Sequence, residues 1–200
     1  MHEHLTVMTR GSILALLISL LAVLLPEGRS SAQERVSINN SVMDFYDNDN
    51  EETGHLHFEG VEINGSLLSV MRNLRKSLKF KPSAGERDPL MKGKWRGDEV
   101  DLRLGTIPNH DLVYVLVLTY PPFKTPEAMK NKYESCKLKL TSRFGEPADI
   151  DEEAPFNQIT VFQCPEGTVT LATSSDWCVR IYYMDRHNNE IAQHEQYGYE

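Results

Sequence analysis

Three cysteines, Cys136, Cys164 and Cys178, carry the most reactive side chains of this sequence. Zinc sites use closely spaced cysteine pairs, and none of the three lies that near another. Cys136 falls within an apolar helical pattern, so we expect it to be a buried free thiol. Cys164 and Cys178 fall far apart in an expected antiparallel meander, which argues against a bridge between them. The sequence leaves open whether any two of the three form a disulfide.

Histidines and paired carboxylates are the other groups that could carry chemistry. His55 and His57 lie at alternate positions of an extended segment, as two metal ligands can, but no third ligand is evident. Asp98 and Glu99 are adjacent carboxylates in an expected turn, where solvation accounts for them. The sequence also lacks the Gly-x-Ser-x-Gly motif of serine hydrolases. We therefore predict no catalytic residue, no metal ligand and no cofactor.

Aromatic side chains near the C-terminal end could bind a partner, because such residues anchor many protein interfaces. Strand alternation places Ile181 and Tyr183 on one face, which we expect to be core. Tyr182 then lies on the opposite face beside Arg180. We predict a contact surface that includes Tyr182, Arg180 and Trp95.

Two helices are predicted from apolar residues that recur at helical spacing. The first begins after Asn64 and Gly65 and must end before Pro82. The second begins at Thr125, a cap residue followed by proline, and ends at Gly145. The apolar stripe of the first contains Leu67, Met71, Leu74 and Leu78, and that of the second contains Met129, Tyr133, Cys136, Leu140 and Phe144.

Residues 91–107 alternate in polarity on either side of a turn and predict a β-hairpin. We expect Gly97–Asp98 to be the two-residue turn. The basic residues of the first strand then face acidic residues of the second, so this face is charge-compensated rather than a phosphate site. The expected cross-strand pairs are Arg96 with Glu99 and Lys94 with Asp101.

Five further strand segments are predicted. Residues 58–66 form a short strand, and residues 112–119 are apolar at nearly every position, as in a strand covered on both faces. Residues 157–164, 167–174 and 177–184 form an antiparallel meander. The predicted fold is therefore α+β, with antiparallel sheet and two main amphipathic helices packed on one side.

The order of these elements hints at a tandem repeat of one helix followed by three strands, over residues 65–120 and 125–184. We expect one α+β domain over residues 55–185. Residues 186–200 are polar and could form a frayed helix, but few apolar residues are present to dock them, so we expect a partly mobile tail.

The N-terminal segment resembles a secretory signal peptide. Arg10 precedes an apolar run that ends at Pro26, and small residues follow. We predict a signal peptide over residues 1–32, cleaved between Ala32 and Gln33. The apolar run is shorter than the roughly 20 residues that cross a bilayer, so we expect no stable membrane anchor after cleavage. The polar, acidic residues 33–54 are a predicted linker.

Composition limits the classes of partner. The chain has 200 residues, with 21 Lys and Arg against 29 Asp and Glu and a net charge of -8. A general nucleic-acid binder needs clustered positive charge, so we expect no nucleic-acid partner. An exported protein of the periplasm or extracellular space follows from the signal peptide.

Several segments carry a family resemblance: the Ile63–Ser66 turn before the first helix, the pattern from Lys132 to Pro147, and the run from Ile181 to Asn188. They resemble small exported proteins of Gram-negative gut anaerobes. That group is similar in layout to OmlA-type outer-membrane assembly lipoproteins and to β-lactamase-inhibitor-like domains. The resemblance implies helices packed on antiparallel sheets and transfers no catalytic or binding residue. Unlike the OmlA type, this chain lacks a lipid-acceptor cysteine.

Two functions remain open at this stage. The first is a non-catalytic binding or inhibitory module whose partner is a protein or small ligand of the cell envelope. The second is a periplasmic enzyme whose active site is assembled from residues distant in sequence. The first predicts a broad exposed sheet face, whereas the second predicts a polar pocket with a perturbed titratable group.

Overall fold

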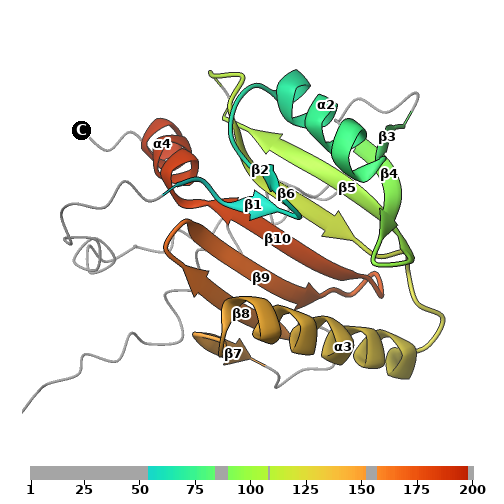
Figure 1. The fold of residues 1–200 in the computed structure, drawn as a ribbon. Coiled ribbons are helices and arrows are strands. Elements are labelled where there is room, and N and C mark those ends of the chain that lie inside the picture. Colours follow the sequence, from blue (N-terminus) through green and yellow to red (C-terminus); the bar gives the residue numbers. More distant parts are fainter. Residues whose placement is uncertain (1–53, 84–89, 108, 152–156, 198–200) are drawn as a thin grey trace, which may run out of the picture. The chain divides into compact units, whose positions relative to one another are not determined.

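A computed structural model describes residues 54–83, 90–107, 109–151 and 157–197. Three helices and two antiparallel sheets make up these ranges, so the α+β prediction is confirmed (Figure 1). The helices are α2 (Leu67–Leu78), α3 (Pro126–Phe144) and α4 (Arg186–Tyr197). The strands are β1 (His57–Phe58), β2 (Val61–Glu62), β3 (Lys81–Pro82), β4 (Leu90–Trp95), β5 (Asp98–Thr106), β6 (Val113–Thr119), β7 (Asp149–Asp151), β8 (Ile159–Cys164), β9 (Gly167–Thr173) and β10 (Val179–Asp185).

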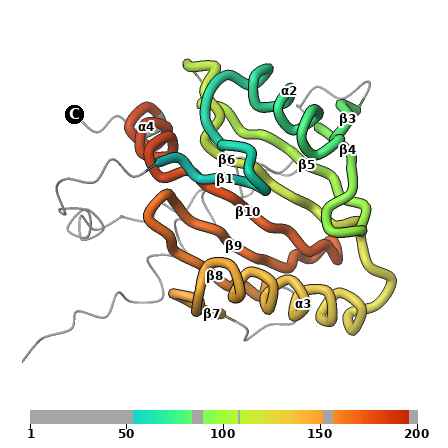
Figure 2. Tube along the Cα trace, viewed as in Figure 1, coloured from blue at the N-terminus to red at the C-terminus, as the bar shows by residue number. Residues whose placement is uncertain are grey.

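The main sheet has eight strands in the order β3-β4-β5-β6-β10-β9-β8-β7, and β1 and β2 form a separate hairpin. Strand β6 lies in the middle, as its apolar sequence predicts, and pairs with β10 from Thr119 opposite Arg180 to Val115 opposite Met184. On each side of this central pair the strands follow in mirrored order. Each half of the sheet has four antiparallel strands, and one helix precedes these four strands in the sequence (Figure 2).

The predicted tandem arrangement has the right order but one strand too few in each half. The missing strands are β3 and β7, which form the two edges of the sheet and have two and three residues. Alternation cannot be recognised in so short a segment. Short edge strands with Pro82 on one side and charged residues on the other also limit pairing with further chains.

Helices α2 and α3 pack on the same face of the sheet, as predicted (Figure 1). Their capping follows the sequence: Ser66 Oγ accepts from the backbone N–H of Ser69, and Thr125 Oγ1 accepts from that of Ala128. The shared core joins their apolar stripes to alternate residues of the central strands. The buried core residues of the helices are Val70 and Leu74 of α2 and Met129, Tyr133, Cys136 and Leu140 of α3.

Two predictions about hairpins need correction. The turn between β4 and β5 is Arg96–Gly97, not Gly97–Asp98, because both turn residues have positive φ (52° and 94°), as a two-residue turn of this hand requires. Lys94 therefore lies opposite Glu99. The other corrected pair is Lys92 with Asp101, at 3.8 Å, in place of Lys94 with Asp101.

The segment predicted as one strand over residues 58–66 instead folds back on itself. Glu59 and Gly60, with φ of 47° and 81°, form the turn of the β1–β2 hairpin. Phe58 and Val61 face each other across it, and both are buried in the core. Glu–Gly is a weak turn signal, because Asn or Asp usually precedes glycine in such turns.

The C-terminal segment was expected to be a partly mobile polar tail, but residues 186–197 form helix α4. Its sequence has few apolar residues, of which Ala192 is buried, and polar contacts at its start also join it to the rest of the domain. Asn188 is buried, and its backbone N–H donates to Asp185 Oδ1 at the start of the helix. Residues 198–200 lie outside the described ranges.

The signal peptide over residues 1–32, its cleavage between Ala32 and Gln33, and the linker up to residue 53 also fall outside the described residues, so these remain predictions. Among the helices that the structure describes, none is long and apolar enough to span a membrane.

Candidate functional site

A cluster of polar donors meets on one carboxylate oxygen at the tip of the β1–β2 hairpin. Glu59 Oε1 accepts from Trp95 Nε1 at 3.1 Å and from a guanidinium nitrogen of Arg96 at 3.3 Å. Arg143, at the C-terminal end of α3, approaches the same oxygen at 3.4 Å and also donates to the carbonyl of His57 at 3.1 Å. We call Trp95, Arg96 and Arg143 the donor triad. Two cations and one indole N–H thus surround a single negative charge.

The donor triad lies next to a cluster of aromatic rings. Phe58 packs edge-on against Tyr183, with ring centroids 5.2 Å apart, and lies 6.3 Å from Trp95. Phe144 contacts Tyr183 from the other side, at 6.4 Å. The hydroxyl of Tyr183 is buried and has no hydrogen-bond partner in the structure. A buried polar group without a partner is uncommon, and one explanation is a site for a ligand or water.

Electrostatics connect the Tyr183 hydroxyl to the donor triad. Burial is the main cause that raises the pKa of Tyr183 above its ordinary value. The charged groups that act on this hydroxyl include Arg143, Glu59 and Arg96, of which the two arginines act to lower the pKa. The hydroxyl therefore lies within electrostatic reach of all three charges and remains a neutral donor at physiological pH.

A second polar contact under α3 involves a buried thiol. Cys136 is fully buried, and its Sγ lies 3.5 Å from the hydroxyl of Tyr120. Burial raises the pKa of both groups, so neither ionises easily. Lys132 covers the Tyr120 ring at 5.0 Å and pairs with Asp98 at 2.9 Å. The prediction of Cys136 as a buried free thiol is confirmed.

The other two cysteines are also free thiols. Burial raises the pKa of Cys164 and raises that of Cys178 to about 11, so these groups are protonated at neutral pH. A thiol must ionise to attack an electrophile or bind a metal. Within the described ranges, no three His, Cys, Asp or Glu side chains are grouped as metal ligands.

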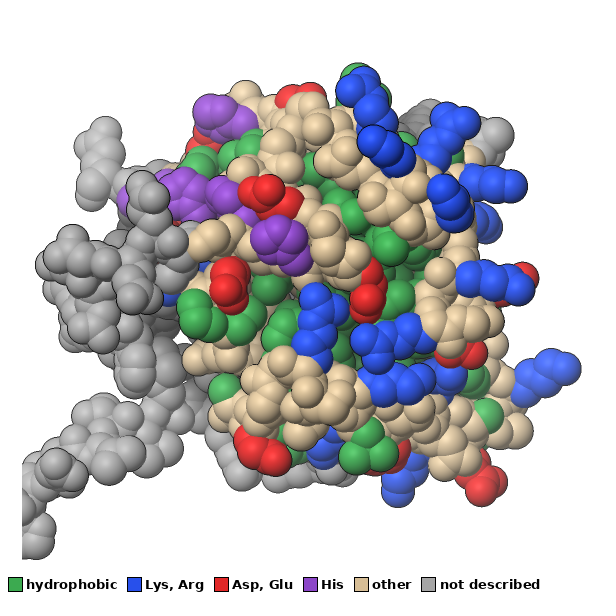
Figure 3. All heavy atoms as spheres, viewed as in Figure 1, with side chains coloured by type: hydrophobic (Ala, Val, Ile, Leu, Met, Phe, Trp, Pro, Cys, Tyr) green, Lys and Arg blue, Asp and Glu red, His purple; other side chains and the backbone are tan. Residues whose placement is uncertain are grey.

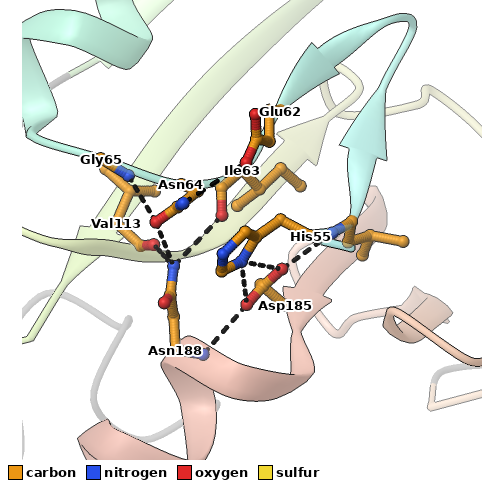
Figure 4. Close-up of polar contacts among 9 residues, drawn as sticks. His55, Glu62, Ile63, Asn64, Gly65, Val113, Asp185 and Asn188 are labelled. Atoms are coloured by element: carbon orange, nitrogen blue, oxygen red, sulfur yellow. Dashed lines mark hydrogen bonds and ion pairs between the residues drawn. The ribbon is translucent and has the colours of Figure 1, made fainter. Parts of the chain in front are cut away.

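A separate polar node fixes the start of β1 to the start of α4 (Figure 4). The fully buried carboxylate of Asp185 accepts from the backbone N–H of Leu56 at 2.8 Å and lies 3.1 Å from His55 Nδ1. Asn188 donates to the carbonyl of Val113 at 2.8 Å, which ties α4 to the central strand. Each member is used in joining backbone segments, so we interpret this node as structural.

The structure places the predicted interface residues differently from the expectation. Tyr182 and Trp95 are each only 4% exposed, so neither ring lies on the surface. Tyr182 is buried because residues on the second face of the central strands, such as Val115 and Val117, are buried as well. Arg180 is half-buried and pairs with Asp176. The broad exposed sheet face expected for a binding module is therefore not present at these strands.

An exposed basic surface lies on α2 and the edge of the sheet. Residues 63–83 contain five cations and no acidic residue, although the whole chain has a net charge of -8. All five of these cations are exposed, and Figure 3 shows lysines and arginines gathered over the α2 and β3–β4 side of this face. We call them the α2 surface: Arg72, Arg75, Lys76, Lys79 and Lys81.

The donor triad and Glu59 come from three distant segments, around residues 59, 95–96 and 143, so no local pattern brings them together. Glu59 falls within the segment expected as one strand, and Arg143 falls in the last turn of a predicted helix. The signal that was available is the Glu–Gly pair between short apolar runs, which permits a hairpin tip.

This chain matches no family model, no curated protein and no solved structure. The described residues provide a cation-rich exposed surface and a donor triad that holds a carboxylate, both of which suit binding of an acidic group.

Proposed function

We propose that this protein is an exported, non-catalytic binding module of the cell envelope that recognises an acidic partner. The observation that carries the proposal is the α2 surface, five exposed cations on a chain with an acidic surplus. Charged surfaces of one sign steer and orient partners of the opposite sign. Export is proposed from the predicted signal peptide, and the resemblance to envelope proteins agrees with it.

The arrangement of α2 supports a surface for contact rather than for packing. Arg72, Arg75 and Lys76 lie on the outer side of the helix, opposite the buried Val70 and Leu74. Two of these cations, Arg75 and Lys76, lie in the last turn of α2, where positive charge interacts favourably with the C-terminal end of the helix. Arg72 lies outside that turn.

One side chain on the same side of α2 is apolar. Leu68 is 70% exposed, although a leucine in a helix of a stable domain is more often buried. It lies one turn before Arg72. Leu138 of α3 is 72% exposed between Lys137 and Lys139, so an exposed leucine does not by itself distinguish the α2 surface, and the proposal depends on the five cations.

The test is binding of the full chain to a short poly-glutamate peptide over a range of salt concentrations. We expect binding that weakens as salt rises, because exposed charges are screened. The variant Arg72→Gln/Arg75→Gln/Lys76→Gln should bind about tenfold more weakly at low salt, since two or three favourable charge contacts are lost.

The matched control changes the same number of charges in α3 and just before it, as Lys124→Gln/Lys130→Gln/Lys139→Gln. Lys124 and Lys130 are exposed, Lys139 is half-buried, and all three lie outside the α2 surface. The control should bind like the wild type. An equal loss in both variants would show that only net charge matters and would overturn the assignment to the α2 surface.

A further inference from the structure

We propose that the donor triad is a binding site for a carboxylate ligand, which Glu59 of this chain occupies until the ligand displaces it. The proposal deepens the function above, because both require an acidic partner. It involves different residues from the α2 surface, so its test is independent.

The three side chains of the donor triad converge on one oxygen atom. Trp95, Arg96 and Arg143 come from the end of β4, the β4–β5 turn and the end of α3, and all three approach Glu59 Oε1 within 3.4 Å. Guanidinium groups and indole N–H groups are donors only, so such a cluster requires an acceptor. Two cations around one carboxylate leave a local excess of positive charge, which favours a further negative group.

Glu59 itself, which accepts from the donor triad in this structure, is held in an unfavourable backbone conformation. Glu59 has a φ of 47°, a backbone conformation that a residue with a Cβ adopts at a cost. It lies in a hairpin whose strands have two residues each, and its side chain is 28% exposed. Figure 1 shows this hairpin in front of the main sheet, between α2 and α3. Because the flanking Phe58 and Val61 are buried in the core, displacement of Glu59 requires rotation of its side chain and not movement of the hairpin.

A buried donor without a partner lies in the same region. The Tyr183 hydroxyl is buried and has no hydrogen-bond partner, and its ring contacts Phe58, the residue before Glu59, with centroids 5.2 Å apart. A carboxylate has two oxygens, and Glu59 presents only Oε1 to the triad. The second oxygen of Glu59 and the Tyr183 hydroxyl thus do not bond each other, and both are groups that a ligand carboxylate in place of Glu59 can use differently.

The chemistry favours a carboxylate over a phosphate. The triad already holds a carboxylate in the observed geometry, and its two guanidinium groups suit a planar acceptor. The carboxylate can belong to a small acid or to an acidic side chain of a partner protein. Acetate represents the first source, and a blocked Ala-Glu-Ala peptide represents the second.

Trp95 provides a direct signal for the experiment. The chain has two tryptophans, Trp95 and Trp177, so the NMR spectrum contains two indole N–H signals. Only the indole of Trp95 donates to Glu59. Trp177 is an internal control in the same sample, and the variant Trp177→Phe assigns the two signals.

The decisive variant is Glu59→Gly in the full chain. Glycine suits the positive φ of this position and removes the occupying carboxylate. We expect acetate to shift the Trp95 signal saturably, with an affinity about tenfold higher than for the wild type, because no internal carboxylate competes. The Trp177 signal should not move.

Three comparisons separate the outcomes. Adding Arg143→Ala to Glu59→Gly should weaken acetate binding about tenfold, as expected for loss of one charge-assisted hydrogen bond. Ala-Glu-Ala binding tighter than both acetate and Ala-Gln-Ala identifies a side-chain ligand, whereas equal binding of the two carboxylates identifies a small acid. Inorganic phosphate binding tighter than either carboxylate would overturn the carboxylate assignment.

The control for the hairpin itself is Glu62→Gln, which changes an exposed carboxylate of the same hairpin outside the triad. It should leave both indole signals and acetate binding unchanged. If Glu59→Gly unfolds the domain, Glu59 is a structural residue and the proposal is wrong. If Glu59→Gly folds and acetate leaves the Trp95 signal unmoved, the proposal is also wrong, whatever the α2 surface binds.

Discussion

Helix α3 covers its half of the sheet with one long apolar stripe, whereas the shorter α2 shares the other half with the β1–β2 hairpin. Four side chains of the 19-residue α3 are buried, against two of the 12-residue α2. On the α2 side, buried residues of the hairpin segment cover the part of the sheet that α2 does not. The buried residues of the hairpin segment are Leu56, Phe58, Val61 and Ile63.

This difference in covering explains where the charged side chains of Glu59, Arg96 and Arg143 meet. A hairpin placed over the sheet beside α2 brings its tip, Glu59, to the border between the two halves. The tip then meets Arg96 of the first half and Arg143 of the second. Glu59, Arg96 and Arg143 therefore meet at the place where the coverings of the two halves differ.

The largest expected effect tests whether the hairpin is part of the core. Phe58→Ala should lower the free energy of unfolding by about 3–5 kcal/mol, because it removes a buried ring and leaves a cavity. The ring contacts Phe80 and Trp95 of the first half and Tyr183 of the second. Urea unfolding monitored by circular dichroism measures the change.

The control for this variant is Leu68→Ala on the exposed side of α2, which should change stability by less than about 0.5 kcal/mol. A loss below about 1 kcal/mol for Phe58→Ala, measured in the same way, would mean that α2 alone covers the first half.

The next effect concerns the buried anchor that joins the hairpin segment to α4. Asp185→Ala should cost about 2–4 kcal/mol, because it removes the cap of α4 and leaves the buried backbone N–H of Leu56 without an acceptor. Hydrogen exchange should show faster exchange at Leu56 and Asn188 than in the wild type. Unchanged protection at both amides would contradict the role of Asp185 as the link.

A smaller effect tests the polar contact between α3 and the sheet. The hydroxyl of Tyr133 lies 2.6 Å from Oγ1 of the buried Thr160. Tyr133→Phe should lower the free energy of unfolding by about 1–2 kcal/mol, since Thr160 loses a partner while the ring still packs. Cys136→Ala, in the same stripe, is the comparison for loss of volume without loss of this bond. Equal stability of Tyr133→Phe and wild type would show that this hydrogen bond does not help to hold α3 on the sheet.

The smallest effect concerns the turn between β9 and β10. Burial alone would raise the pKa of Asp176, but the Ser174 hydrogen bond and the Arg180 charge outweigh it, so the pKa lies below the ordinary 3.8. A lowered carboxyl pKa stabilises the folded state above the unfolded pKa, and this contribution disappears as pH falls through the folded pKa.

Arg180→Gln should therefore raise the Asp176 pKa toward 3.8, measured by NMR titration of its carboxyl carbon. The cost in stability at neutral pH should be below about 1 kcal/mol, because the carboxylate is half-exposed. The difference between variant and wild type should vanish in acid. A stability difference that persists below the folded pKa would show that packing of Arg180, rather than its charge, matters.

Much of the local structure could be predicted from sequence. Residues 125–145 specify α3 and both of its ends, because a threonine cap, a first-turn proline and a terminal glycine act locally. The apolar run of β6 specifies a strand buried on both faces. Both helices were also expected on one side of the sheet, since each has a single apolar stripe.

The missed elements are those whose stability comes from distant partners. Helix α4 has a polar sequence, and it forms because Asp185 and Asn188 meet the backbone of Leu56 and Val113. The β1–β2 hairpin has strands too short for alternation to be recognised, and burial against Tyr183 and Trp95 holds it. Tyr182 was predicted to be exposed by alternation, but the second face of the central strands is buried as well.

Neighbouring residues suffice for the fold class, for both ends of α3 and for the buried central strand β6, because caps and apolar patterns act locally. The tertiary structure alone decided that Glu59, Trp95, Arg96 and Arg143 meet. Their convergence depends on how a hairpin, a turn and a helix end are placed around one sheet. No local pattern encodes such a meeting, because each donor satisfies an acceptor that lies far away in the chain.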